Sequence, residues 1–363
     1  MILILCIKIL VNKKVFFYFF IMTDNFCKKL SIKISVSTGQ IEDLELLLFS
    51  LIDLANNSIN SLYLKIEEGS DLLCLRLFNS DIISFLHNFC EKYNIKKSQI
   101  TIEHSNLVQD KNIWPNYIHY FFSKPMLYGQ NVNFKLNKQI TKKFGLFVGG
   151  SRWHRLWLGS YLYNQCKQDI LISYHQNHFN KTQPANLYID DLLLKLHDKK
   201  DVGCLERISY FCKKLPLHLD DSVEKNNKGY INYDRAYDII KYYNNIFVDI
   251  VCETWHEGNA FMPTEKIGRC FISKTPFIVY GGKNYLFNLK KLGFLTFGNI
   301  FDESYDNHEG IERIFAIKQI IDFLAAKNYK ELISINQKID NILEHNLHVY
   351  LGLTQEKIKK AFQ

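Results

Sequence analysis

Segments with the apolar pattern of β-strands alternate with segments patterned like amphipathic helices along most of this 363-residue sequence. The first series contains four strand-like runs and two helical patterns, at residues 31–36, 60–66, 73–77 and 100–103 and at residues 41–54 and 81–93. Asp81 stands where the second helix needs an N-cap. Alternation of this kind is typical of a mostly parallel sheet covered by helices, so the sequence predicts an α/β fold.

A second series begins at Lys143, after an irregular stretch that fits a crossing between domains. It contains four strand-like runs and three helical patterns, at residues 144–148, 169–173, 246–252 and 276–280 and at residues 152–166, 233–243 and 264–273. Residues 311–362 follow as mainly amphipathic helix. We therefore predict two α/β domains, at residues 22–139 and 140–363, with a helical C-terminal tail. A single large doubly wound sheet is the alternative architecture.

The first 21 residues are apolar but are interrupted by Asn12, Lys13 and Lys14, so neither piece reaches the ~18 apolar residues of a membrane-spanning helix. We interpret residues 1–21 as an upstream extension of the reading frame before Met22, with a membrane anchor or a first core strand as alternatives.

Nine scattered cysteines without a C-x-x-C pair indicate a reducing compartment. We expect a cytoplasmic protein, with membrane association through residues 1–21 as the alternative.

The chain carries a formal net charge of +8, which can serve nucleic acid, anionic lipid or a phosphate-bearing small ligand. It has no long Lys/Arg run, no zinc-finger spacing and no basic helix leading into heptads. Nucleic acid is therefore not an expected partner.

We predict no metal site, because His175 and His178 lack a nearby third ligand and Asp190 and Asp191 fit a helix start.

The chemistry is concentrated in residues 247–306, where a strand ends in a polar loop and a helix begins at Thr264. Ligands of open α/β sheets bind outside the carboxyl ends of the strands, and a helix start there offers N–H groups to a phosphate. Thr264 can cap the helix and Lys266 can add charge toward the same anion. Glu253, Glu257 and Glu265 surround this place, and carboxylates beside a phosphate point to sugar or ribose hydroxyls.

The order of these residues resembles the donor motif of fucosyltransferase-like GT-B glycosyltransferases. There a glutamate ends a strand, T-E-K opens a helix and a P-F/I-V-G strand follows; here these are Glu253, residues 264–266 and residues 276–281. The resemblance implies that Glu253 or Glu265 contacts ribose or sugar hydroxyls and that Lys266 meets the diphosphate.

Glu257 and Glu265, with seven residues between them, are also similar to the paired-glutamate motif of many retaining GT-B enzymes. That similarity implies that Glu257 faces the donor sugar, as a catalytic residue, and that Glu265 faces the ribose. The two resemblances differ in stereochemical outcome, which stays open.

Residues 144–165 resemble the first strand, turn and helix of such a donor domain. The resemblance implies that Arg152 and Arg155 reach the diphosphate, for which forked guanidinium groups are suited; a solvated helix face is the alternative. The resemblance to GT-B glycosyltransferases covers roughly the C-terminal half of the chain. It implies two Rossmann-like domains in a GT-B arrangement. The donor would be a nucleoside diphosphate sugar, with a GDP-sugar favoured, and no cofactor would be permanently bound.

An inverting transferase also needs a base from the acceptor-side domain, and Glu103 and His104, which follow a strand, are the candidates there. The predicted reaction moves a sugar to a hydroxyl of a glycan or another acceptor. A non-catalytic nucleotide- or glycan-binding protein of the same fold is the first alternative, and a nucleic-acid-modifying transferase is the second.

Overall fold

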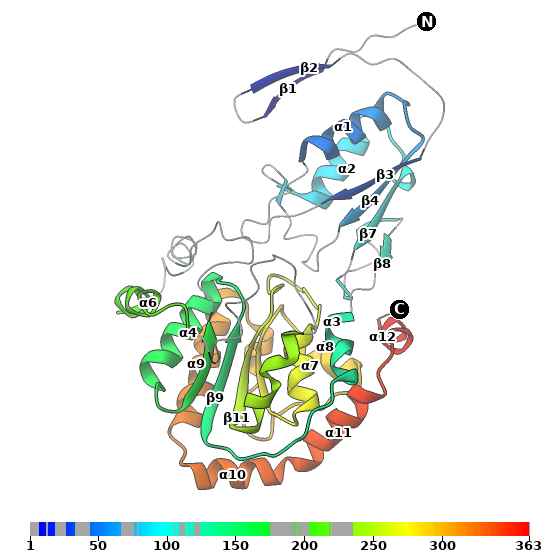
Figure 1. Ribbon diagram of the computed structural model, residues 1–363. Helices are drawn as coiled ribbons and strands as arrows, with labels where there is room; N and C mark the ends of the chain where they lie inside the picture. The colour runs from blue at the N-terminus through cyan, green and yellow to red at the C-terminus, as the bar shows by residue number, and fades with distance from the viewer. Residues whose placement is uncertain are drawn as a thin grey trace, which may run out of the picture. The chain divides into compact units, whose positions relative to one another are not determined.

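The structure is a computed structural model with mixed α/β architecture and parallel sheets. It describes residues 7–11, 14–18, 27–32, 44–66, 76–77, 80–104, 106–108, 113–115, 117–119, 124–174, 192, 196, 203–217, 219 and 235–362. The chain divides into two compact units (Figure 1). Unit 1 comprises Met1–Glu68, Leu75–Ser105 and Asp110–Tyr120, and unit 2 comprises Gly69–Cys74, Asn106–Gln109 and Phe121–Gln363.

Unit 1 contains a four-stranded parallel sheet in the order β3-β4-β7-β8. Its strands are β3 (Cys27–Ile32), β4 (Ser61–Ile66), β7 (Ile100–His104) and β8 (Tyr117–His119). The helices α1 (Leu44–Ala55) and α2 (Ile82–Lys92) connect them, as the alternating pattern predicts. The predicted N-cap is confirmed, because the Asp81 carboxylate accepts the Ser84 N–H at 2.8 Å.

Unit 1 also contains the 3-10 turn η2 (Lys97–Gln99) and two short antiparallel hairpins. They are formed by β1 (Ile7–Val11) with β2 (Lys14–Tyr18) and by β5 (Arg76–Leu77) with β6 (Ser80–Asp81). The apolar N-terminal stretch is therefore a strand pair where the structure describes it. Among all described residues, no helix combines the length and the apolar character that crossing a membrane requires. The predicted strand and helix residues 33–36, 41–43 and 73–75 lie outside the described residues.

Unit 2 is built on a second parallel sheet, in the order β10-β9-β11-β12. The strands are β9 (Lys142–Val148), β10 (Ile170–Tyr174), β11 (Ile246–Cys252) and β12 (Phe277–Tyr280). Every residue of β11 and β12 is buried, as the continuous apolar runs of a sheet covered on both faces predict. All four predicted strands of this series are confirmed to within two residues.

The crossover helices α4 (Trp153–Gln165) and α7 (Glu265–Ile272) follow β9 and β11. Trp153 and Trp157 are 3% and 0% exposed, so both belong to the core, as expected for two large apolar residues one helical turn apart. The described residues of the predicted helix at 233–243 form a 3-10 helix, η6 (Arg235–Asn244), in place of an α-helix. Another helix of this unit is α6 (Cys204–Cys212).

The segment before β9 packs inside unit 2, although the sequence pattern assigns residues up to 139 to the N-terminal domain. It contains α3 (Lys124–Tyr128) and the 3-10 turn η4 (Gly129–Asn131). Gln130 Nε2 donates to the Leu353 carbonyl at 2.9 Å, and the Gln139 N–H donates to the Asn244 carbonyl at 2.7 Å. These bonds join the segment to the C-terminal half, which no local pattern could show.

Helices dominate the rest of unit 2, as the tail pattern predicts (Figure 1). They are α8 (Tyr285–Lys291), the 3-10 turn η7 (Ser304–Asn307), α9 (Gly310–Ala325), α10 (Tyr329–Lys338), α11 (Asp340–Leu351) and α12 (Gln355–Ala361). The Asp306 carboxylate accepts the N–H groups of Leu286 and Phe287, which fixes the start of α8. Arg313, 1% exposed, forms a buried ion pair with Asp306 at 3.1 Å.

Candidate functional site

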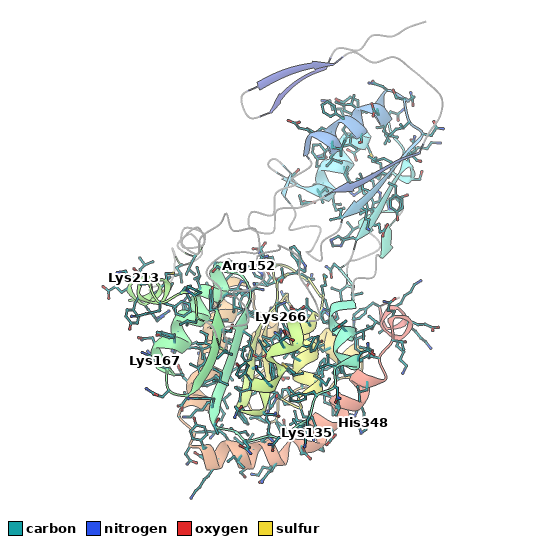
Figure 2. The ribbon with its side chains drawn as sticks, in the orientation of Figure 1. Lys135, Arg152, Lys167, Lys213, Lys266 and His348 are labelled. Atoms are coloured by element: carbon teal, nitrogen blue, oxygen red, sulfur yellow. The ribbon has the colours of Figure 1, made fainter. Side chains whose placement is uncertain are left out.

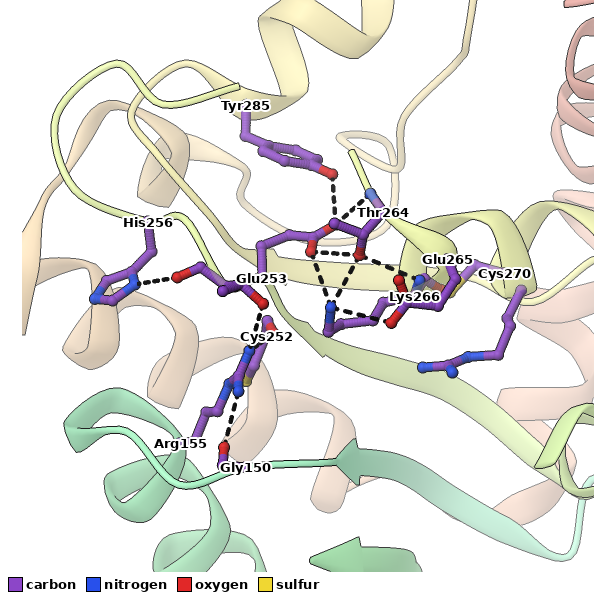
Figure 3. Close-up of polar contacts among 12 residues, drawn as sticks. Gly150, Arg155, Cys252, Glu253, His256, Thr264, Glu265, Lys266, Cys270 and Tyr285 are labelled. Atoms are coloured by element: carbon purple, nitrogen blue, oxygen red, sulfur yellow. Dashed lines mark hydrogen bonds and ion pairs between the residues drawn. The ribbon is translucent and has the colours of Figure 1, made fainter. Parts of the chain in front are cut away.

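Glu253, the first residue after β11, lies at the centre of a cluster at the carboxyl edge of the unit 2 sheet (Figure 3). Its carboxylate is fully buried and accepts the Thr264 hydroxyl at 2.7 Å and the Thr264 N–H at 3.1 Å. Tyr285 OH donates to it at 3.0 Å, and Lys266 Nζ lies 3.4 Å away. The cluster therefore joins the end of β11 to the starts of α7 and α8.

The amino end of α7 is thus occupied by an internal anion. Thr264 caps the helix by accepting the Lys266 N–H at 3.4 Å, and Glu253 lies against the same turn. Lys266 Nζ is shared between Glu253 and Glu265, which lies 3.3 Å from it. Glu253 already accepts the Thr264 N–H and hydroxyl, so a phosphate finds fewer free donors at this turn.

Glu265 keeps some access to solvent, with a side chain 17% exposed. Burial alone would raise the pKa of its carboxyl, but the positive charges of Lys266 and Arg269 hold that pKa below its ordinary value. Glu265 is therefore an ionised acceptor able to receive hydroxyl groups. Glu257, the other half of the predicted glutamate pair, lies exposed on the loop between β11 and α7, apart from the described contacts of Glu253.

Both arginines predicted to reach a diphosphate are buried at the start of α4, so the alternative of a solvated helix face is wrong: Arg152 is 4% exposed and Arg155 is 5% exposed. Arg155 donates to the carbonyls of Gly150 and Cys252, at 2.8 and 3.0 Å. It therefore ties the turn after β9 to the end of β11, one residue before Glu253. Among the described residues, no carboxylate lies within ion-pair distance of Arg155.

Arg152 is the N-cap residue of α4, and its side chain makes no capping hydrogen bond. Its guanidinium carbon lies 5.9 Å from the centre of the Trp255 ring. Figure 2 shows Arg152 and Lys266 at the same edge of the unit 2 sheet. The helix start, Arg152 and Arg155 together make the α4 side of this edge positive.

Several polar groups are buried at the same helix start, namely the Ser151 hydroxyl, the His154 ring and the Arg155 Nε. Ser151 interacts with the Tyr174 hydroxyl, and His154 with the backbone of Glu253. Buried polar groups are nearly always hydrogen-bonded in native proteins, so the start of α4 is a polar place inside the fold.

His154 packs within an aromatic group at the ends of β11 and β12. Its ring stacks on Tyr280 with centroids 4.6 Å apart, and its centroid lies 4.0 Å from that of His256. Burial, followed by the charges of His256, Arg155 and Arg152, holds the pKa of His154 well below its ordinary value. His154 is therefore a neutral imidazole with one N–H donor and one acceptor nitrogen.

The candidate acceptor-side residues, Glu103 and His104, lie at the carboxyl end of β7 in unit 1. Glu103 is 9% exposed and accepts a short hydrogen bond from Tyr63 OH, while His104 is fully buried. The hydrogen bond to Glu103 is the main cause that raises the pKa of Tyr63 to about 12. Glu103 is thus held by a neutral phenol from the neighbouring strand.

Two groups of residues considered for metal binding, His175 with His178 and Asp190 with Asp191, lie outside the described residues. Within the described ranges, no group of three or more His, Cys, Asp or Glu side chains is placed to hold a metal ion.

The sequence pattern missed several members of this edge. Tyr285 donates to Glu253, and Thr254 accepts from Arg155. Ser151 and His154 lie with the arginines at the start of α4. The available signal for His154 was its position between two arginines directly after a strand and turn. Compared with models of protein families and with proteins of curated function, the chain matches none.

Proposed function

We propose that the chain is a glycosyltransferase that binds a nucleoside diphosphate sugar at the carboxyl edge of the unit 2 sheet. The supporting observation is the division of charge along this edge. The α4 side carries buried Arg152 and Arg155, while the α7 side carries Glu253 and Glu265 beside Lys266. A diphosphate suits the first side, and ribose or sugar hydroxyls suit the second.

The proposal shifts the diphosphate from the α7 start, where the sequence pattern puts it, to the start of α4. Glu253 already occupies the α7 start, whereas α4 has no side-chain cap. Arg152 and Arg155 would offset the charge that develops on the departing diphosphate, because fixed donors in a buried site need no reorganisation during the reaction. Glu265 would receive ribose or sugar hydroxyls, and Lys266 would orient it.

Two Rossmann-like domains in a GT-B arrangement belong to the same proposal. Each unit has its own parallel sheet, and Glu103 and His104 end a strand in unit 1, where an acceptor-side base is required. A GDP-sugar remains the favoured donor and a glycan or another hydroxyl compound the acceptor.

The proposal is tested by thermal unfolding of the full chain with GDP, UDP, ADP and their sugars. A ligand at 100 times its dissociation constant adds about 2.7 kcal/mol of stability, which raises the unfolding temperature by several degrees. We expect one sugar nucleotide to stabilise the wild type and Arg152→Gln to lose most of that gain. Lys167→Gln, which changes an exposed residue just beyond the other end of α4, is the matched control and should keep it.

Catalysis is tested with the sugar nucleotide that stabilises the protein. Release of its nucleoside diphosphate in the presence of a glycan acceptor supports the transferase, and binding without any release supports the non-catalytic alternative. If no nucleoside diphosphate stabilises the wild type, or if Arg152→Gln and Lys167→Gln behave alike, the proposed donor site is wrong.

A further inference from the structure

A pocket of about 280 Å³ lies in unit 2 between the end of α8, the end of α11 and α12. Eight residues line it: Lys291, Leu292, His348, Val349, Gly352, Leu353, Lys357 and Ala361. Three of them are basic and none is acidic. The pocket shares α8 with the Glu253 cluster but no residue, because Tyr285 begins that helix and Lys291 ends it. The proposed function therefore does not depend on the pocket.

The three basic side chains come from three different helices, with Lys291 ending α8, His348 in the last turn of α11 and Lys357 in α12. Basic groups near helix carboxyl ends commonly stabilise the helix dipole, and Lys357 Nζ does donate to the Gly352 carbonyl at 2.7 Å. Lys291 differs, because its Nζ lies over two aromatic rings, 4.8 Å from the centre of Phe287 and 5.7 Å from that of Phe362. An aromatic face attracts this cation without neutralising it.

The surroundings of the pocket are apolar and partly open to solvent. Leu292 and Leu353 form buried parts of its wall, whereas Phe287 is 57% exposed and Leu351, next to Gly352, is 50% exposed. Phe287 and Lys291 are four residues apart on α8 and therefore share a helix face. Exposed apolar groups beside lysines are the combination by which proteins bind the surface of an anionic membrane.

We propose that this pocket binds the phosphate of an anionic membrane lipid, with Phe287 lying against the acyl region. The lysines meet the phosphate, since charge complementarity around an acid-free pocket favours an anion. The apolar wall and the exposed ring favour a lipid over free phosphate, which has no apolar part. Unit 2 would then hold the chain at a membrane surface by a charge-dependent contact.

The test measures partition of the full chain onto phosphatidylcholine vesicles with and without phosphatidylglycerol, at low and high salt. Each lysine near an anionic surface contributes about 1 kcal/mol, or about fivefold in affinity, so the double variant Lys291→Gln/Lys357→Gln should bind anionic vesicles about 25-fold more weakly. The matched control is Lys167→Gln/Lys213→Gln, which removes two exposed lysines elsewhere in unit 2, as Figure 2 shows. It should lose less than about fivefold. Phe287→Ser should weaken binding while preserving its salt dependence.

Residues 1–21 contribute equally to every variant, so differences between variants report on the pocket. Charge-selective binding that the test pair loses and the control pair keeps supports the proposal. Equal partition onto neutral and anionic vesicles, or equal loss in both pairs, overturns it. Stabilisation of the chain by inorganic phosphate without vesicle binding, abolished in the test pair, would also overturn it, because the pocket would then be a free phosphate site.

Discussion

At the scale of single residues, Asp249 shows how a carboxylate is held inside a sheet. It lies in the middle of β11, is 2% exposed and accepts the Tyr243 hydroxyl at 2.6 Å. Arg269 Nε donates to the same hydroxyl at 3.0 Å, so its positive charge is close to the carboxylate. Burial nevertheless dominates and raises the pKa of Asp249 to about 6, because desolvation penalises the charged form.

This shift gives a stability prediction with a definite sign. The folded pKa lies above the ordinary value of about 4, so the native state binds more protons than the unfolded state between about pH 4 and 6. The contribution of Asp249 is therefore greatest below about pH 4 and is lost as the pH rises through 6. We expect Asp249→Asn to remove this part of the pH dependence, measured by urea unfolding at several pH values. Asp238→Asn, an exposed control, should retain it, and identical slopes for both variants would contradict the assignment.

At the scale of elements, the start of α7 depends on one residue that performs two tasks. The Thr264 hydroxyl accepts the Lys266 N–H, which caps the helix, and also donates to Glu253. The same hydroxyl thus marks the point where the loop ends and α7 begins, and it supplies a hydrogen bond to the fully buried Glu253 carboxylate after β11. An element boundary and the candidate site are therefore stabilised by the same atom.

Replacing Thr264 separates these contributions. Thr264→Ala should lower the free energy of unfolding by about 1–2 kcal/mol through the lost cap, and by about 1 kcal/mol more because Glu253 loses a donor. Thr264→Ser retains the hydroxyl and should lose much less. Chemical denaturation of the three proteins measures the difference. If serine is as destabilising as alanine, the methyl group rather than the hydroxyl is the stabilising part.

At the scale of the whole molecule, the two larger sheets formed by the described strands are separate, with no hydrogen-bonded pairing between them. Each sheet has its own buried residues, such as Leu64 in unit 1 and Ile278 in unit 2, both 0% exposed. The main apolar cluster of unit 2 runs from Leu107 to Ile358 and contains no strand residue of the unit 1 sheet. Separate cores of this kind are expected to unfold as separate cooperative units.

Calorimetry of the full chain should therefore show two transitions. Leu64→Ala and Ile278→Ala each remove several buried carbon atoms, which costs about 2–5 kcal/mol, and each should lower the temperature of one transition only. A single transition that both variants shift equally would show that the two units unfold together.

Much of the local structure was predictable from the sequence. The strands β9, β10, β11 and β12, the caps at Asp81 and Thr264 and the position of the candidate site after β11 follow from hydrophobic periodicity and capping chemistry. These signals are local, because a strand or a helix start is specified by neighbouring residues. The sequence also indicated that Arg152, Arg155, Glu253, Glu265 and Lys266 belong near one sheet edge, and the structure brings them there.

Only the tertiary structure decided which atoms meet. Glu253 is held by Tyr285, Arg155 bonds the end of β11, and residues 124–139 join unit 2, all through contacts between residues far apart in the chain. Because Glu253 lies against the start of α7, we propose the start of α4 as the positive end of the site. The physical reason is that a buried charge takes the partner that the crossing of strands and helices brings within hydrogen-bond distance, and no periodicity along the chain encodes that crossing.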